Sequence, residues 1–222
     1  MKTVLFKAFA DNRDPASLSS RLRRKRLAFF LSLAARLDKP ATILDIGGTE
    51  DFWRATIVDT ERGIQVTLLN LSEQSLSSPN FTSVKGDARG LQFPDASFDI
   101  VFSNSVIEHV GDFEDQRKMA EEVRRVGKRY FVQTPNLYFP IEPHFLFPFF
   151  QFMPLVTRAW LLRRFKLGWF DREPDPKRAQ AIVESVRLLS KKEMLALFPS
   201  SCLFEEKFFG LTKSFVAYSG WR

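Results

Sequence analysis

Small and acidic residues that could hold a nucleotide-like ligand follow the first apolar run of the chain. The segment Thr42–Thr49 has the sequence TILDIGGT, an aliphatic stretch that ends in paired glycines. A continuous aliphatic run is typical of a buried parallel strand, and glycine lets the next turn bring backbone N–H groups against a ligand. Because a strand followed by Gly-Gly is also an ordinary tight turn, this motif alone leaves both interpretations open.

Polar residues follow four further apolar runs. The runs at 64–69, 81–84, 98–103 and 129–134 each have the length and composition of a buried strand. The carboxyl ends of parallel strands meet at one edge of a sheet, so side chains at these ends would converge on one ligand. The strand-end residues able to hydrogen-bond a ligand are Asp45, Asn70, Asp87, Ser103, Asn104 and Asn136.

Helical segments separate these strands. Residues 17–38 place apolar side chains at three- and four-residue steps after serine caps, and residues 50–60 and 112–126 follow the first and fourth strands. Strands that alternate with helices favour a mostly parallel sheet with helices on both faces and right-handed crossovers. We therefore expect a single α/β domain, a Rossmann-like three-layer sandwich.

The composition fits one globular domain and narrows its chemistry. The chain has 222 residues, of which 45% are hydrophobic, and a formal net charge of +7. Its single cysteine, Cys202, excludes an internal disulfide and suits a reducing compartment. Because His109 and His144 are its only histidines, no metal site is expected from the usual Cys and His ligands. Residues 1–10 lack the apolar core of a signal peptide, so the expected location is the cytoplasm, with the inner face of a membrane as the alternative site of attachment.

Basic residues gather in two places. Residues 21–26 form one basic cluster, and further arginines and lysines are spread among aromatic residues over 158–172. Positive charge of this density favours an anionic partner, whether phosphate, nucleic acid or an acidic membrane surface. For residues 21–26, a solvated helix face is the simpler interpretation.

An aromatic segment of different composition spans residues 137–176. Several prolines and Glu142 interrupt it, so it cannot form a membrane-spanning helix of about 20 apolar residues. Its rings suit a lid over an apolar acceptor, docking at an anionic membrane surface, a dimer patch or an enlarged core, and the sequence leaves these open. Glu142 and His144 are its polar residues placed to contact a ligand.

The strand-end motifs together resemble the class I S-adenosylmethionine-dependent methyltransferases, in particular the type 11 group that includes quinone-biosynthesis-like enzymes. The resemblance covers residues 41–136 and is carried by LDIGG at 44–48, Asn70, GDA at 86–88, FPDASFDIVFS at 93–103 and IEHV at 107–110. It implies a seven-stranded, mostly parallel sheet that ends in an antiparallel hairpin over 204–218. Within one domain it implies a basic helical extension (1–39), a cofactor-binding core (41–136), a lid or membrane-facing insert (137–176) and a C-terminal helix and hairpin (177–222).

The resemblance also assigns roles to residues. It implies that Asp45 engages the amino group of S-adenosylmethionine, Asn70 its ribose and Asp87 its adenine. Ser103 and Asn104 would then lie below the transferred methyl group. The complete set of expected cofactor contacts is Asp45, Gly47, Gly48, Asn70, Leu71, Asp87, Ala88, Ser103 and Asn104. The expected acceptor contacts are Asn136, Glu142 and His144.

Proton transfer is assigned to one histidine. When the acceptor must lose a proton, His109 is expected to take it, because an imidazole has a pKa near neutrality. Its structural alternative is a histidine that caps or packs a helix. Glu108 is expected to be a solvated residue at the start of a helix.

Two departures from the family pattern bear on function. Thr49 and Asp51 stand where further glycines are usual, and Asn70 replaces an acid, which predicts weaker cofactor binding. The expected function is methyl transfer to a small apolar or lipid-linked acceptor. The alternatives are a non-catalytic binding protein on this scaffold and a nucleic-acid methyltransferase, which is disfavoured because the fourth strand lacks an Asn-Pro-Pro-Tyr-like motif.

Overall fold

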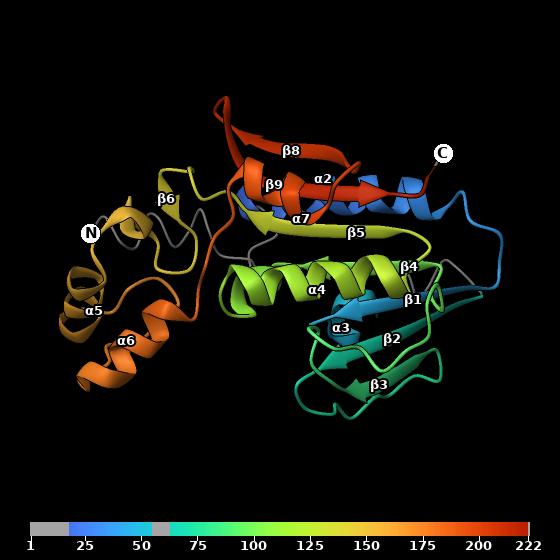
Figure 1. The fold of residues 1–222 in the computed structure, drawn as a ribbon, viewed down its shortest axis with the longest axis horizontal. Helices are drawn as coiled ribbons and strands as arrows, with labels where there is room; N and C mark the ends of the chain where they lie inside the picture. Colours follow the sequence, from blue (N-terminus) through green and yellow to red (C-terminus); the bar gives the residue numbers. More distant parts are fainter. Residues whose placement is uncertain (1–17, 55–62, 222) are drawn as a thin grey trace.

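A seven-stranded sheet forms the centre of the computed structural model, which describes residues 18–54 and 63–221 (Figure 1). The strand order is β3-β2-β1-β4-β5-β9-β8. Strands β1 to β5 run parallel to one another, and β9 is antiparallel to both of its neighbours. The strands are β1 (Ala41–Ile46), β2 (Ile64–Asn70), β3 (Phe81–Lys85), β4 (Ile100–Asn104), β5 (Tyr130–Pro135), β8 (Cys202–Phe208) and β9 (Leu211–Ser219).

The expected α/β fold with a C-terminal antiparallel hairpin is confirmed, with small differences at the ends of elements. The fourth strand begins at Ile100, because Phe98 makes only an isolated bridge to Gly127. The first helix ends at Ala34 instead of residue 38. The helix expected over 50–60 is described as far as Arg54. The expectations for residues 1–17 and 55–62 lie outside the described residues.

Helices cover both faces of the sheet. α2 (Leu18–Ala34) and α3 (Glu50–Arg54) pack on one face, where Phe30 and Trp53 are buried against Phe102 of β4. α4 (Phe113–Val126) and α7 (Lys191–Leu197) pack on the other face, and Met119 and Met194 belong to its buried cluster. In Figure 1, α4 lies in front of the sheet and α2 behind it. The three layers of the expected sandwich are therefore present.

Two basic residues of α2 turn toward the protein. The side chain of Arg26 is only 11% exposed, and its Nε lies 3.5 Å from Oε1 of Glu206 on β8. Burial lowers the pKa of Arg26. It also lowers the pKa of Arg23, which is less deeply buried. The interpretation of residues 21–26 as a solvated face is therefore wrong for these two residues, because this part of α2 packs toward the acidic side chain on β8.

A second, smaller hydrophobic core lies beside the sheet. It is built by β6 (Ile141–Glu142), β7 (Phe147–Pro148), the 3-10 turn η2 (Phe150–Phe152), α5 (Leu155–Arg164) and α6 (Pro176–Glu184). Its buried residues are Phe145, Phe150, Leu162, Leu167, Ala179 and Val183. Figure 1 shows these elements at the end of the molecule toward which the parallel strands point. Throughout 18–54 and 63–221, no helix has the length and apolar character needed to cross a membrane.

Candidate functional site

The loop after β1 closes tightly on its own strand. Gly47 has a φ of +79°, and a Cβ there would lie 2.5 Å from a methyl group of Val106. A Cβ on Gly48 would lie 1.6 Å from Oδ2 of Asp45, so a side chain there would displace the buried carboxyl. Both glycines are therefore required by the packing of the loop, in addition to any contact with a ligand.

Asp45 is a buried carboxyl at the end of β1, just before this loop. It is 2% exposed, and its Oδ2 accepts a hydrogen bond of 2.6 Å from Nε1 of Trp53 on α3. Burial raises the pKa of Asp45 to about 8, although the bond from Trp53 acts in the opposite direction. A positively charged group placed beside this carboxyl would stabilise its charged form. The expected contact with an amino group is chemically suited to this position.

Asn70 ties the loop after β1 to the end of β2. Its Nδ2 donates a hydrogen bond of 3.0 Å to the carbonyl oxygen of Gly48, and the side chain of Gln74 reaches the same oxygen at 3.4 Å. The amide nitrogen thus holds the loop, and its Oδ1 is the atom that would serve a ribose hydroxyl. The next residue, Leu71, is 78% exposed.

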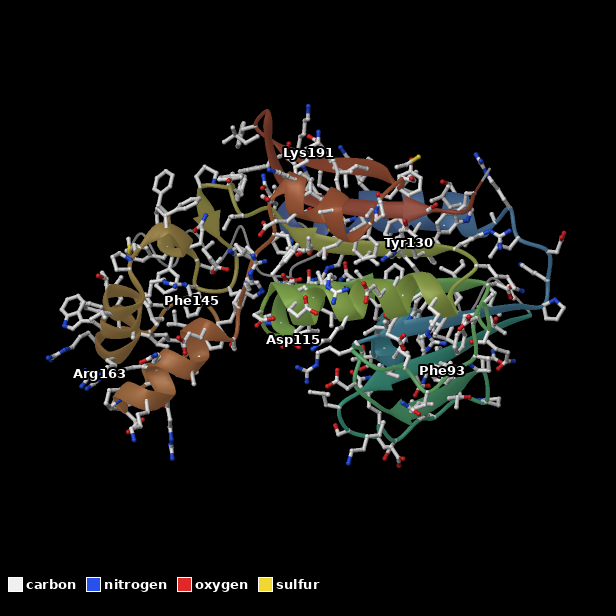
Figure 2. The ribbon with its side chains drawn as sticks, in the orientation of Figure 1. Phe93, Asp115, Tyr130, Phe145, Arg163 and Lys191 are labelled. Carbon is white, nitrogen blue, oxygen red and sulfur yellow. The ribbon has the colours of Figure 1, made fainter. Side chains whose placement is uncertain are left out.

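Asp87 is held by a neighbouring arginine. Both of its carboxylate oxygens accept hydrogen bonds from the Arg89 guanidinium, at 2.6 to 3.1 Å, and these bonds lower the pKa of Asp87. Arg89 also lies 3.2 Å from Asp115, which Figure 2 labels near the start of α4. An adenine amino group would have to share the carboxylate with Arg89. The adjacent Ala88 is buried.

The end of β4 supplies an unusual buried hydroxyl. Ser103 has no exposed surface and lies beside Ile46 of β1 in the parallel register. Its Oγ has no hydrogen-bond partner among the residues that the structure describes. Asn104 follows it at the half-buried tip of the strand. Both residues lie at the carboxyl end of β4.

Two histidines and two glutamates meet beyond β4. The ring of His109, at the end of the 3-10 turn η1 (Ile107–His109), packs edge-on against the ring of His144, with 4.8 Å between centroids. Nδ1 of His144 lies 2.7 Å from Oε1 of Glu142. Nε2 of His144 lies 3.9 Å from Oε1 of Glu108. The expected proton acceptor and two expected acceptor contacts are therefore brought together.

The expectation that Glu108 is solvated is wrong, because the structure buries this side chain. It has no exposed surface, and its Oε2 accepts a hydrogen bond of 3.1 Å from the hydroxyl of Thr134 on β5. Burial raises the pKa of Glu108 to about 7. The insert brings Nε2 of His144 to within 3.9 Å of this carboxylate, and His144 is itself bonded to Glu142. Sequence reasoning missed this residue because an acid at a helix start is ordinarily exposed.

The electrostatics of the two histidines differ. Burial disfavours a charged ring at His144, but its hydrogen bond to Glu142 and the nearby acids outweigh burial and raise its pKa. His109 lies at the surface, yet desolvation of part of its ring and the proximity of His144 lower its pKa. The pair therefore favours a proton on His144 before one on His109.

The side chain of Asn136 hydrogen-bonds two backbone groups. Its Nδ2 donates to the carbonyl oxygen of Thr212 at 2.7 Å, and its Oδ1 accepts from the N–H of Tyr138 at 3.0 Å. These bonds join β5, the start of the insert and the hairpin of β8 and β9. Contact of this side chain with an acceptor would compete with both bonds.

A cavity of about 520 Å³ separates the insert from the three-layer domain. Its apolar walls include Leu137, Phe145, Phe150 and Leu188. Its polar lining includes Glu142, Gln151, Arg158 and Arg187. Figure 2 shows Phe145 among the elements of the insert. Gln151, Arg158 and Arg187 were not singled out as a site from the sequence, because nothing local distinguishes them from other surface polar residues.

Two polar atoms at this cavity lack partners. Oε1 of Gln151 and Nε of Arg158 are buried without a hydrogen bond within the described ranges 18–54 and 63–221. Buried polar atoms are ordinarily satisfied by protein, water or a ligand. Glu142 lines this cavity and also binds His144, so the cavity adjoins the cluster of histidines beyond β4.

Comparison with known proteins relates the domain to methyltransferases. Residues 44–130, about two fifths of the chain, match the family model described as a methyltransferase domain, type 11. The uncharacterised protein Rv1509 of Mycobacterium tuberculosis is 38% identical over 62 residues, which cover 28% of this chain and 21% of that protein. The chain thus matches about a fifth of the length of its curated relatives.

Solved structures share the fold at low identity. The 1,6-didemethyltoxoflavin-N1-methyltransferase of Burkholderia thailandensis, solved with 1,6-didemethyltoxoflavin and S-adenosylhomocysteine bound, has a TM-score of 0.54 and 14% identity, and the match covers 97% of this chain and 84% of that one. The PH0226 protein of Pyrococcus horikoshii has a TM-score of 0.52 and 20% identity, with 92% of each chain covered. At these identities the likeness establishes the fold.

The sheet order and the match over residues 44–130 identify the fold as that of a Rossmann-like methyltransferase domain. Within that fold, residues 44–130 are similar to the type 11 methyltransferase domain.

Proposed function

We propose that this protein transfers a methyl group from S-adenosylmethionine to a small amphipathic acceptor held between the sheet edge and the insert. The observation that carries the proposal is the cavity beneath the insert, whose lining includes Leu137 just after β5 and Gly111 and Asp112 just before α4. Its apolar rings suit the hydrophobic part of such an acceptor. Nε of Arg158 and Oε1 of Gln151, which have no partner among the residues that the structure describes, suit a polar group.

The residues after β1, β2 and β3 fit the cofactor. Asp45 would pair with its amino group, Asn70 would reach a ribose hydroxyl through Oδ1, and Asp87 with the Ala88 backbone would face the adenine. The buried Ser103 hydroxyl, unpartnered within the described part of the chain, supplies a polar atom at the floor of this site. Leu71 and Asn104 would complete its walls.

The chemistry requires little of the protein beyond alignment. When bound, S-adenosylmethionine supplies a methyl group on a positively charged sulfur, and this group passes in line to an acceptor atom as the electrons of the broken bond stay on sulfur. The chain positions the two reactants and excludes water from them. The insert is the element placed to provide that exclusion.

Calorimetric titration tests the cofactor site. We expect saturable binding of S-adenosylmethionine and S-adenosylhomocysteine but not of NAD, and we expect Gly47→Val and Asp87→Ala to abolish it. Asp95→Ala is the matched control, because that carboxylate is 80% exposed on another loop. A folded protein that binds neither compound would contradict the proposal and favour the non-catalytic scaffold.

We also propose that the outer face of the insert docks on an anionic membrane surface. Residues 138–169 expose seven large apolar side chains: Tyr138, Phe149, Phe152, Val156, Trp160, Phe165 and Trp169. Arg164 and Lys166 are exposed among them. Aromatic rings with interleaved basic residues are suited to the interface of a membrane with anionic lipids. This arrangement fits an acceptor that is itself lipid-linked.

A further inference from the structure

The only two histidines of the chain converge with a glutamate into a compact set of donor atoms. One ligand atom from each of Glu108, His109 and His144 lies within 4.8 Å of the other two. His109 and Glu108 come from η1, whereas His144 comes from the insert. Two imidazoles and one carboxylate are a common donor set for divalent transition metals.

The carboxylate of Glu108 is aimed into this set. Its Oε1 is buried and has no hydrogen-bond partner within the ranges that the structure describes. Nε2 of His144 lies 3.9 Å from this oxygen. A buried carboxylate oxygen that lacks a hydrogen bond is costly unless a cation or a proton compensates it. The unpaired oxygen therefore supports a bound cation independently of the clustering of the three side chains.

Outer contacts orient both imidazoles. Because Nδ1 of His144 lies 2.7 Å from the Glu142 carboxylate, that nitrogen carries the proton and Nε2 is the one directed at Glu108. The Glu142 carboxylate is itself fixed by the backbone N–H groups of His144 and Phe145. The ring of His109 hydrogen-bonds the backbone of Ser185. A carboxylate that orients a ligating histidine is a frequent feature of zinc sites.

We propose that Glu108, His109 and His144 bind one divalent transition-metal ion of the zinc kind, with Glu142 as the positioning residue. In a tetrahedral site with bonds of about 2.1 Å, donor atoms lie about 3.4 Å apart, so the set must close by about 1.4 Å at its widest. Three protein ligands leave a fourth position for water or for an oxygen of the acceptor. The sequence gives no signal for this site, because its third ligand is a glutamate and its three ligands come from two distant segments.

Metal titration tests the proposal without a methyl-transfer assay. The experiment uses untagged full-length protein carrying Cys202→Ser, treated with a chelator, so that neither a tag nor the exposed thiol supplies ligands. We expect Zn²⁺ to bind at one ion per chain by calorimetry, and Co²⁺ to give the visible absorption of a nitrogen- and oxygen-ligated ion. Because no cofactor is present, failure here and failure of the cofactor titration are separate results.

Substitutions locate the ion. Glu108→Gln and His144→Gln should each weaken Zn²⁺ binding at least tenfold, and Glu142→Gln should weaken it about 10–100-fold although it keeps all three ligands. Glu205→Gln, on β8 and away from the cluster, is the control and should bind as the parent does. Absence of saturable binding, or a dissociation constant unchanged in Glu108→Gln and His144→Gln, would overturn the proposal. If Glu108→Gln does not fold, the Zn²⁺ affinity of His109→Gln, a change at the surface, replaces it. Weaker binding would support the site, and an unchanged dissociation constant would overturn it.

Discussion

At the end of β1, one carboxyl group links the loop, the helix and the expected ligand. Asp45 is buried, bonded to Trp53 and packed against Gly48 so closely that no side chain fits there. Its pKa of about 8 means that the protein without a ligand holds a proton on it near neutral pH. A residue of this kind costs stability when charged, and it is suited to a site that receives a positive charge.

Asp45 predicts a specific pH dependence of folding. Because its pKa rises from 3.8 to about 8 on folding, the folded protein keeps a proton that the unfolded chain loses between these values. Its contribution to stability is complete below pH 3.8 and is lost as the pH rises through 8. We expect Asp45→Asn to remove this dependence, so that the variant gains on the parent by up to about 1.4 kcal/mol per pH unit between pH 5 and 8.

Urea unfolding at several pH values provides the measurement for Asp45→Asn. Parallel stability profiles for the two proteins would contradict the raised pKa. Asp99→Asn is a useful comparison. Burial raises the pKa of Asp99, but hydrogen bonds from Lys128 and Thr42 outweigh it and lower the pKa. The Asp99 carboxylate therefore stabilises the fold less as the pH falls, so the stability lost in Asp99→Asn should shrink at acid pH.

At the scale of elements, the insert combines a buried inner side with an exposed outer side. Phe145 and Phe150 stack at 4.3 Å between centroids inside it, whereas Trp160 and Phe165 form an exposed ring pair at 6.3 Å. Figure 2 shows Arg163 on the part of the insert that lies farthest from the sheet. The inner rings belong to the cavity and to the small core, so only the outer rings are available to a membrane.

Vesicle binding tests the outer face of the insert. We expect the protein to sediment with phosphatidylserine-containing vesicles at low salt and to dissociate as salt is raised. Trp160→Ser/Phe165→Ser should weaken this binding by about tenfold, since both rings leave the interface. Phe209→Ser is the control, because Phe209 is 91% exposed on the turn between β8 and β9. Equal binding to neutral and anionic vesicles, or none to either, would contradict the docking proposal.

At the scale of the whole molecule, three hydrophobic clusters divide the chain into a sandwich and an insert. Two clusters lie on the two faces of the sheet, and the third consists only of residues between Phe145 and Val186. The cavity lies where the insert meets the sandwich. An element with its own small core can open without unfolding the sheet, which would let an acceptor enter.

Amide hydrogen exchange tests this division. We expect two levels of protection, with the amides of β1, β4 and β5 exchanging most slowly and those of α5 and α6 exchanging faster. Phe145→Ala, which removes a buried ring at a cost of about 3–5 kcal/mol, should abolish protection in α5 and α6 and leave β1 and β4 protected. Identical protection of both regions in the parent protein would show instead that they unfold as one unit.

The sequence alone determined the sandwich and the positions of its site-bearing loops. Apolar runs of strand length, amphipathic spacing and turn residues are local signals, so they predicted the strands from β1 to β5 and α4 within a few residues. The same signals placed Asp45, Asn70, Asp87 and Ser103 at one edge, because parallel strands share their carboxyl ends. The closing hairpin was predicted only from the family resemblance.

Only the tertiary structure decided which side chains meet. The bond from Trp53 to Asp45, the inward turn of Arg26 and the burial of Glu108 beside His144 depend on elements that pack from distant parts of the chain. The insert shows the same limit, since its composition allowed a core, a lid and a docking face, and its fold supplies an inner and an outer side. Contacts of this kind follow from packing in three dimensions, for which no local pattern in the sequence is a signal.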